Sequence, residues 1–497
     1  MSLPTTTEHG LCGYQLGSST REIWRARAAA LSELLAEFRW LVDMHIVDFF
    51  VQNAWAALPG EWQSEFDTQW DKALPELVDL ASGGQWRSSG PASLHQFINA
   101  CHTLALDRSP GLHSTPQGNR VKAAPCLNSQ VPPLDSRILP GMNPKKVEEV
   151  ASLAFLVSKV ARKSKAHLIA DVGAGQGYLS RALAYQYHHA VLAIDGDSGQ
   201  TRGAQQWQKS TAKRVHSVTA QDTLLLAAAA PGLAHEAYLR HVTCRIDSTN
   251  LPTVDQLVAN VQTRTAPLNN SCAPEVSPQS RWVVCGLHAC GNLSVAMLQW
   301  FVETNAQALI IVGCCYNLMK EEHGSEPFPL CHSLATNQDL ATPHFLKLAC
   351  QAPMRWSDQI SQSIRNFDRN FYRALLHYVM IDQGLVTTSD PFPVVGRMRS
   401  NAFQDFPTYC RRALSRLGHE CISETTLTQY YDTHAPSAYR LAVVWTLRAL
   451  LAPCIESLIL LDRCLYLVDK GCAVSLIPLC DAVVSPRNMV IVATKST

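Results

Sequence analysis

Short apolar runs separated by stretches of helical periodicity dominate the middle of this chain. Five such runs follow one another, at 168–172, 191–195, 241–247, 281–291 and 308–316. Apolar strands that alternate with helices are typical of a parallel sheet covered by helices on both faces. Two later runs, 473–479 and 488–494, are close enough along the chain to pair antiparallel. The pattern predicts an α/β fold with a Rossmann-like sheet of seven strands.

The segments that flank this sheet pattern are helical in character. Apolar residues recur at three- and four-residue spacing within 21–62, and a second helix is predicted over 93–106. Asn143 and Pro144 are typical of a helix start, as cap and first helical residue. We therefore expect four segments: a helical N-terminal region with a flexible linker over 1–140, a core over 141–318, a mostly helical insertion over 319–440, and a helix and strand pair over 441–497 that complete the core. Residues 214–240 and 251–280 interrupt the alternation and are expected to form loops or additional helices.

The stretch 441–468 is apolar enough to resemble a membrane span. It contains four charged residues and Pro453, and its longest uncharged runs are seven residues, whereas a spanning helix needs about 20 residues with few or no charges. A buried helix is the favoured interpretation, and membrane anchoring is the minority alternative. A secretory signal begins with a positively charged stretch that is followed by an apolar one. The first ten residues do not show this order, so no secretory signal is expected.

Composition narrows the function classes. Apolar residues make up 47% of the chain, and 42 basic residues against 41 acidic ones give a net charge of +1. This nearly neutral balance argues against a polybasic protein that wraps nucleic acid. A neutral total is still compatible with a local basic face. The 17 cysteines are odd in number and scattered, which is typical of reduced thiols. An intracellular location, cytoplasmic or nuclear, follows as an expectation.

A glycine-rich turn after the first strand carries the clearest chemical signal. Glycines there permit a tight turn and close approach of a ligand to the backbone. The dinucleotide fingerprint needs a small residue at its sixth position, but Tyr178 stands there. Gly173, Gly175 and Gly177 instead alternate after an acid, Asp171. This form is typical of S-adenosylmethionine sites, in which the acid can meet the amino-acid end of the cofactor.

Two further acids stand at predicted strand ends. Asp195 follows Gly175 by 20 residues, the spacing expected for a carboxylate that binds ribose hydroxyls, and Asp197 is the fallback. Asp247 ends the third predicted strand and is expected to face the adenine edge, with a loop-capping role as the alternative.

The ends of the fourth and fifth strands are the expected acceptor side, because ligands gather at the carboxyl ends of parallel strands. His288 is a candidate general base, since its ordinary pKa of about 6.5 suits proton transfer. Tyr316 is a candidate for stacking on a flat acceptor or on adenine. The alternative is that both residues only brace these loops. An Asn/Asp-Pro-Pro-Tyr-like element is lacking, so methylation of exocyclic base nitrogens is not supported.

The cysteines at the same strand ends raise the question of a zinc site. The candidate ligands are Cys290, Cys314, Cys315 and His288, with Cys331 and His332 as additions. In metal sites, two ligands are usually separated by two residues, as in C-x-x-C. Adjacent cysteines do not easily bind one tetrahedral ion together. We therefore expect no metal, and thiols that pack against the cofactor pocket.

Several motifs together carry a family resemblance, and they are spread over nearly the whole chain: NPKKVEEV (143–150), DVGAGQGYLSR (171–181), GLHACGNLSVA (286–296), VGCCYNL (312–318), FYRALL (371–376), LAPCIESLILLDRCLYL (451–467) and SPRNMVIVATK (485–495). They resemble the methyltransferase-like protein 25 family, and its B-type branch most. The resemblance implies a seven-strand methyltransferase sheet and an S-adenosylmethionine-dependent methyltransferase. It implies cofactor contacts by Asp171, Gly173, Gly175, Gly177 and Asp195. The name of this branch refers to a ribosomal RNA adenine dimethylase domain. This chain lacks the Asn-Leu/Ile-Pro-Tyr element of those dimethylases, so the name is weak evidence for the substrate.

Segment 341–416 bears on the acceptor. Its ten basic and five acidic residues give a charge of +5, and aromatic residues interleave with them, among them Phe367, Phe371, Tyr372 and Phe403. This mixture suits phosphate contact with base stacking, and it equally suits a solvated helical insertion. RNA or an RNA-associated protein is the expected acceptor, with catalysis mostly by alignment. The alternative function is a non-catalytic, cofactor-binding scaffold with the same fold.

Overall fold

The computed structural model describes residues 5–6, 12–16, 21–67, 74–87, 89–109, 112–114, 120–122, 130–216, 239–247, 256–258, 281–322, 326–334, 340–388 and 392–495. The chain forms two compact units. Unit 1 comprises Met1–Ala29, Asp107–Gln338 and Leu458–Thr497, and unit 2 comprises Ala30–Leu106 and Asp339–Ser457. The N-terminal helices and the insertion thus share a unit, while the four-segment division expected from the sequence remains a prediction.

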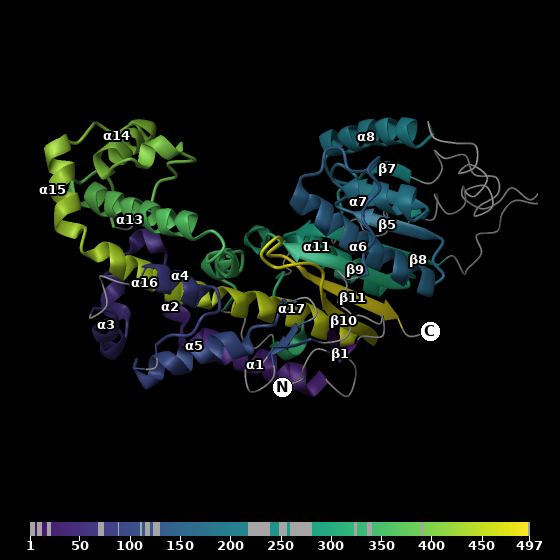
Figure 1. Ribbon diagram of the computed structural model, residues 1–497, viewed down its shortest axis with the longest axis horizontal. Helices are drawn as coiled ribbons and strands as arrows, with labels where there is room; N and C mark the ends of the chain where they lie inside the picture. The colour runs from purple at the N-terminus through teal and green to yellow at the C-terminus, as the bar shows by residue number, and fades with distance from the viewer. Residues whose placement is uncertain are drawn as a thin grey trace, which may run out of the picture. The chain divides into compact units, whose positions relative to one another are not determined.

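Unit 1 is built on one nine-stranded sheet in the order β1-β2-β10-β11-β9-β8-β5-β6-β7. Its strands are β1 (Thr5–Thr6), β2 (Cys12–Leu16), β5 (Leu168–Val172), β6 (Val191–Asp195), β7 (Leu239–Thr243), β8 (Trp282–Cys290), β9 (Ala308–Cys314), β10 (Cys472–Pro478) and β11 (Met489–Lys495). A separate hairpin pairs β3 (Leu112–Ser114) with β4 (Arg120–Lys122). Figure 1 shows the main sheet with its flanking helices.

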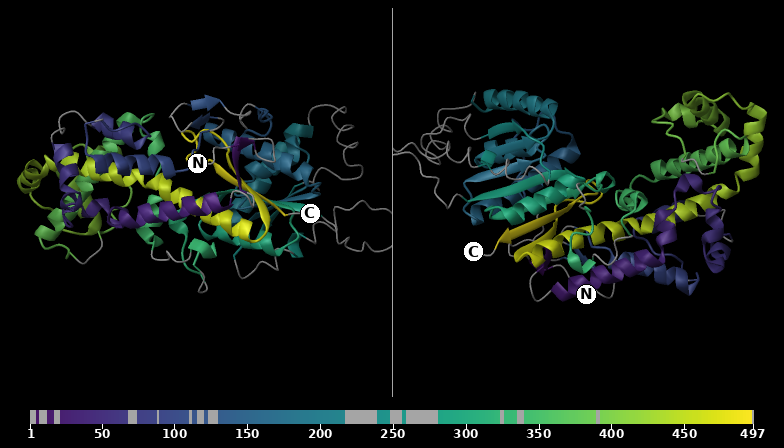
Figure 2. Two further views of the ribbon diagram at one scale, coloured as in Figure 1. Left: turned by 90° about the horizontal axis from the view of Figure 1, so that it is seen from below. Right: turned by 180° about the vertical axis from the view of Figure 1, so that it is seen from behind.

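Seven of these strands form the predicted methyltransferase sheet. β5, β6, β7, β8 and β9 pair in parallel, and β11 inserts antiparallel between β9 and β10. The strand order therefore confirms the predicted Rossmann-like fold. β1 and β2, which the sequence did not predict, extend the sheet beyond β10, as the purple and yellow strands of Figure 2 show.

Helices cover both faces of the sheet in unit 1. They are α6 (Pro144–Lys163), α7 (Tyr178–Arg181), α8 (Ser198–His216), α11 (Asn292–Glu303) and parts of α1 (Arg21–Glu37) and α17 (Ala452–Asp469). α6 packs on the face that contains Ile169 and Val283, and successive strand residues point to opposite faces. The Trp282 ring therefore lies on the other face, where it contacts Trp300 of α11 with ring centroids 5.0 Å apart.

The predicted start of α6 is confirmed in detail. The side chain of Asn143 accepts a hydrogen bond from the backbone N–H of Lys146 at 2.8 Å, and Pro144 is the first helical residue. This cap fixes where α6 begins, and the helix ends at Lys163, shortly before the first core strand.

Unit 2 is helical. It contains α2 (Arg39–Asp43), α3 (Gly60–Asp67), α4 (Leu74–Ala81), α5 (Ala92–Leu104), α12 (Pro343–Leu348), α13 (Ile360–Asp382), α14 (Phe406–Leu417), α15 (Glu424–His434), α16 (Ser437–Leu450) and the rest of α1 and α17. Aromatic rings form much of its core. Phe367 contacts Trp445 edge-to-face at 5.3 Å, and Trp356 contacts both rings.

The apolar stretch near the C-terminus forms two helices and not one long helix. α16 ends at Leu450 and α17 begins at Ala452, next to Pro453. The region Ser437–Asp469 is long and apolar enough to cross a membrane, with a mean hydropathy of 1.7, but 89% of the most apolar window is buried inside the protein. This burial agrees with the predicted core helix.

The end of β7 differs from the prediction. The third core strand ends at Thr243, four residues before Asp247, because the backbone leaves the sheet there. Most of the predicted interruptions at 214–240 and 251–280 lie outside the described residues.

Candidate functional site

A cavity of about 380 Å³ opens in unit 1 at the carboxyl ends of the parallel strands. Segments that follow β5, β6, β7 and β8 contribute to its wall, together with residues from 318–322 and 326–327. The lining residues are Val172, Gly173, Ile194, Asp195, Gly196, Cys244, Arg245, Ile246, Asp247, Cys290, Gly291, Asn292, Leu293, Val295, Ala296, Gln299, Leu318, Lys320, Glu322, Glu326 and Pro327. Its position is where an open parallel sheet places its ligand.

The glycine turn lies at one side of this cavity. Gly173, Gly175 and Gly177 have φ values of 69°, 54° and 69°, a left-handed conformation that favours glycine. A Cβ atom on Gly177 would lie 2.9 Å from the His241 ring, so packing explains that glycine. A Cβ atom on Gly175 would meet no described heavy atom within 4 Å. Gly173 lines the cavity, so the turn presents backbone without a side chain to the cavity wall.

Asp195 joins the glycine turn to the next strand. Its carboxylate accepts hydrogen bonds from the backbone N–H of Gly175 at 2.8 Å and of Asp197 at 2.9 Å. The residue also lines the cavity. Asp197 is the cap of α8, since its side chain accepts from the N–H groups of Gly199 and Gln200. Of the two predicted candidates for ribose binding, the geometry therefore favours Asp195.

Asp247 lines the cavity although it lies beyond the end of β7. Arg245, the neighbouring cation, is 3.8 Å from its carboxylate, and the Asp247 side chain is 24% exposed. The predicted position beside the cofactor pocket thus agrees with the structure, and the adenine contact itself stays a prediction.

Asp171 does not reach the cavity. The residue is buried, and its carboxylate accepts a hydrogen bond from the Ser180 hydroxyl. Burial raises the pKa of Asp171 to about 7; the Ser180 hydrogen bond opposes this shift and the charge of Asp195 adds to it. The structure therefore does not support the predicted contact with the amino-acid end of the cofactor, because the side chain points into the protein from the strand.

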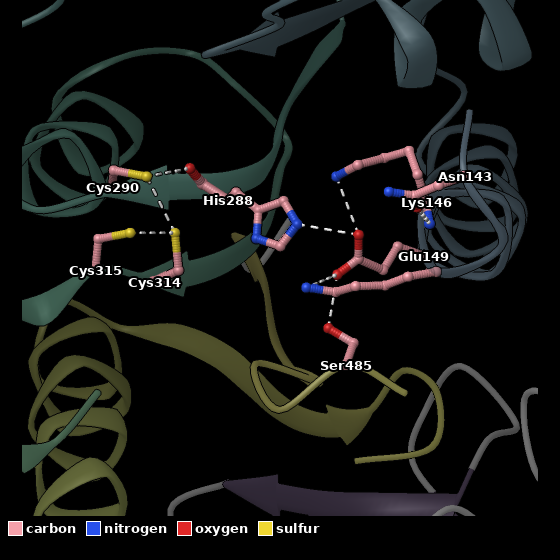
Figure 3. A network of polar contacts seen from close by, with 9 residues as sticks. Asn143, Lys146, Glu149, His288, Cys290, Cys314, Cys315 and Ser485 are labelled. Carbon is pink, nitrogen blue, oxygen red and sulfur yellow. Dashed lines mark hydrogen bonds and ion pairs between the residues drawn. The ribbon is translucent and has the colours of Figure 1, made fainter. Parts of the chain in front are cut away.

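His288 is held by an acid from helix α6, as Figure 3 shows. Its Nε2 lies 3.1 Å from Glu149 Oε2, and Ser485 donates to Glu149 Oε1 at 2.6 Å. Lys146 Nζ approaches the same carboxylate at 3.0 Å. Burial alone would raise the pKa of Glu149, but the hydrogen bond and charge of His288, with the contacts of Ser485 and Lys146, hold it well below its usual range. His288 is not among the described cavity-lining residues, so this geometry favours bracing over general-base work.

Tyr316 is completely buried. The guanidinium groups of Arg463 and Arg487 lie 5.3 Å and 5.8 Å from the centre of its ring. The ring is thus enclosed by cations of unit 1 and is not among the described lining residues. This position does not favour the predicted stacking on an acceptor or on adenine, because the ring has no exposed face.

The sequence did not predict the partner of His288. Glu149 is a charged residue on the buried face of α6, next to Val150 and Leu153. Acids almost never occupy a fully buried position unless they are paired, so this interruption of an apolar helix face was the available signal.

The comparisons with known proteins agree with this architecture. Residues 145–322 match a family model described as a methyltransferase domain. This part of the chain is similar to a methyltransferase domain. The match begins at the start of α6 and includes the glycine turn, Asp195, His288 and most of the cavity.

Curated relatives resemble the chain over most of its length. A human protein named "probable methyltransferase-like protein 25" is 23% identical, over 95% of this chain and 97% of its own length. A mouse protein of the same name is 25% identical over 71% of this chain and 75% of its own. These relatives confirm the predicted resemblance, and the B-type branch stays a prediction.

A solved structure of coclaurine N-methyltransferase bound to N-methylheliamine and SAH is also similar. It is 12% identical, with a TM-score of 0.18, over 57% of this chain and 63% of that chain. This TM-score is too low to support an argument about the fold. The fold is therefore assigned from the strand order of this chain.

Proposed function

We propose that the chain is an S-adenosylmethionine-dependent methyltransferase whose cofactor binds in the cavity beside Gly175 and Asp195. Asp195 carries this proposal, because it lines the cavity and its carboxylate accepts a hydrogen bond from the Gly175 N–H. The chemistry of the lining fits the cofactor as well: Asp195 and Asp247 offer carboxylates for hydroxyl and amino groups, while Ile194 and Ile246 offer apolar surface for a flat base. The matching family model supports the same reaction class.

The residues of the chain act by binding and alignment. The bound cofactor would supply an electrophilic methyl group, and the protein would hold it so that the acceptor attacks in line. Asp195 orients one end of the cavity through its bond to the Gly175 N–H. The Glu149–His288 pair fixes the carboxyl end of β8, which carries Cys290 and Gly291 of the lining. Such positioning accounts for much of the rate gain in reactions of two bound groups.

Replacement of Asp195 by asparagine tests the cofactor assignment. We expect Asp195→Asn to weaken S-adenosylmethionine binding by about 10- to 100-fold, because each hydrogen bond to a charged group contributes about 1.5–3 kcal/mol. Isothermal titration calorimetry measures this change. Asp197→Asn is the matched control, since it removes the same charge two residues away and should leave the affinity within about twofold. The reverse result would assign the ribose contact to Asp197, and unchanged binding in both variants would contradict the site.

We further propose RNA as the acceptor, bound in part by unit 2. A surface groove of about 730 Å³ lies between α14 and the segment before it. It is lined by Met398, Arg399, Ala402, Gln404, Thr408, Arg411, Arg412, Ser415 and Arg416. Four of these residues are arginines, and none of the described lining residues is acidic. Guanidinium groups suit phosphate oxygens through paired hydrogen bonds.

The four aromatic residues predicted to stack on bases contact other side chains of unit 2. Phe367 and Phe371 are buried, and Tyr372 contacts Phe406, Tyr409 and Tyr431 inside unit 2. Phe403 stacks on Tyr409, and the Arg369 guanidinium lies 5.1 Å from the centre of the Phe403 ring. Base stacking by these four residues is therefore not supported, because their rings contact other side chains of unit 2. Phosphate contact is the part of the prediction that remains.

The double variant Arg411→Gln/Arg412→Gln tests the groove. We expect it to weaken binding of a fluorescein-labelled single-stranded RNA and to lower the slope of log affinity against log salt by about 1.4, because each lost phosphate contact on a single strand contributes about 0.7. Fluorescence anisotropy at several salt concentrations measures both. Arg355→Gln/Arg365→Gln removes the same charge from unit 2 outside the groove and is the control. Equal losses in the two double variants would show a diffuse charge effect and contradict a specific groove.

The alternative function, a non-catalytic scaffold, predicts a different outcome. It would be favoured by tight cofactor binding without transfer of a labelled methyl group to RNA or to proteins of a cell extract. An RNA-associated protein as acceptor would instead show label in the protein fraction alone. An intracellular location, cytoplasmic or nuclear, is part of the proposal.

A further inference from the structure

Three cysteine thiols converge at the carboxyl ends of β8 and β9. Cys290 and Cys314 are aligned as neighbours on the parallel strands, and their sulfur atoms lie 3.1 Å apart. The sulfur of Cys315 lies 3.6 Å from that of Cys314. All three sulfur atoms lie within 4.8 Å of one another, and Figure 3 shows them pointing toward one another. No described cysteine of the chain forms a disulfide.

The convergence of two adjacent cysteines has a structural cause. In an extended strand, successive side chains point to opposite faces, so Cys314 and Cys315 would be expected to diverge. Cys315 instead has φ 49° and ψ 49°, a left-handed conformation that is uncommon for a residue other than glycine. This conformation turns its side chain back toward Cys314. The spacing argument against shared ligation by these two cysteines therefore does not hold.

The ligand atoms that converge at this point are all sulfur. Nε2 of His288 is occupied by Glu149, and the thiol of Cys290 lies 3.2 Å from the backbone carbonyl of His288. In tetrahedral zinc thiolates, bonds of about 2.3 Å place the sulfur atoms about 3.8 Å apart. The observed separations lie around this value, so small side-chain rotations would suffice for one ion. Thiolate ligands select soft ions such as zinc and not magnesium or calcium.

We propose that Cys290, Cys314 and Cys315 bind one Zn²⁺ ion through three sulfur atoms. Three protein ligands with a fourth position left for water or substrate are the arrangement of zinc sites that take part in reactions, whereas purely structural sites have four protein ligands. Cys290 also lines the cavity of the methyltransferase domain, so the ion lies at the cavity wall. The proposal does not depend on cofactor binding.

Zinc titration of the reduced, metal-free full chain tests the site. A chromogenic chelator competes for the ion, and we expect one Zn²⁺ per chain in the wild type. Cys290→Ser and Cys315→Ser should each weaken binding at least about tenfold, because a neutral hydroxyl is a poor zinc ligand compared with a thiolate. Cys421→Ser, at an exposed cysteine of unit 2, is the matched control and should bind like the wild type.

Cobalt substitution provides a second readout. Co²⁺ in a site with three thiolates gives a strong sulfur-to-metal charge-transfer band, which should be lost in Cys290→Ser/Cys315→Ser. The thermal melting curve of each variant, recorded without metal, separates loss of ligands from loss of the fold. Zinc binding that survives the double substitution, or no binding by folded wild-type protein, would overturn the site. S-adenosylmethionine calorimetry on zinc-free protein is a separate measurement, so the two proposals can fail independently.

Discussion

Replacement of Gly175 by arginine should abolish S-adenosylmethionine binding and leave the fold intact. The new side chain would enter the open space in front of Gly175, where the cofactor is proposed to bind. A left-handed conformation costs an ordinary residue about 1–2 kcal/mol, which a domain of this size tolerates. We expect affinity to fall by more than about 100-fold, equivalent to about 2.8 kcal/mol, in isothermal titration calorimetry.

Gly384 offers a matched control for this substitution. It also has φ 69° and no described heavy atom within 4 Å of an added Cβ, but it lies at the end of α13 in unit 2. Gly384→Arg therefore places an arginine in a similar left-handed conformation, at a similar cost in stability, and adds the same charge. The Gly384→Arg protein should bind the cofactor like the wild type. Unchanged binding by Gly175→Arg would remove the glycine turn from the site, and loss of binding in both variants would show a general effect of stability.

Asp171→Asn should make the protein more stable at pH 8 than the wild type, with little change at pH 4. The pKa of Asp171 is raised from 3.8 to about 7 by burial. Between these two values the unfolded chain has lost the proton that the folded chain keeps, so the stability of the wild type falls as the pH rises through this window. At 1.36 kcal/mol per pKa unit, the full difference is about 4 kcal/mol as an upper bound. The asparagine can still accept the Ser180 hydrogen bond and has no charge to bury.

Thermal unfolding at several pH values measures this difference. A gain of about 4 kcal/mol corresponds to a rise in melting temperature of roughly 8–16 °C for a domain of 150–250 residues, and half of it would be clearly resolved. Asp197→Asn, at an exposed position of the next loop, should show no gain that grows with pH. An equal shift for Asp171→Asn at pH 5 and pH 8 would show that the carboxyl group does not titrate in this window.

The core sheet was predictable because its strands are buried on both faces. Such strands appear as continuous apolar runs, and the runs at 168–172 and 191–195 match β5 and β6 residue for residue. β1 and β2 were not predictable, because β2 is short and pairs with β10, which lies more than 450 residues away along the chain. Local patterns carry no information about such a partner.

The candidate site was predictable in composition and less so in geometry. The pattern of glycines and acids at strand ends identified Gly173 and Asp195, which line the cavity, because topology alone brings the carboxyl ends of parallel strands together. The directions of the side chains could not be predicted from the sequence. Asp171 turns inward, and a single left-handed residue redirects Cys315. Both depend on packing that only the folded chain specifies.

The position of β11 has a consequence for the order of folding. This strand comes last along the sequence, yet it lies between β9 and β10 in the interior of the sheet. Until residues 489–495 have left the ribosome, β9 has an unpaired edge and β10 has no strand to join it to the core. The nascent methyltransferase domain therefore waits with an open sheet edge, which is a template for aggregation. Closure of this edge therefore requires release of the last described strand, β11.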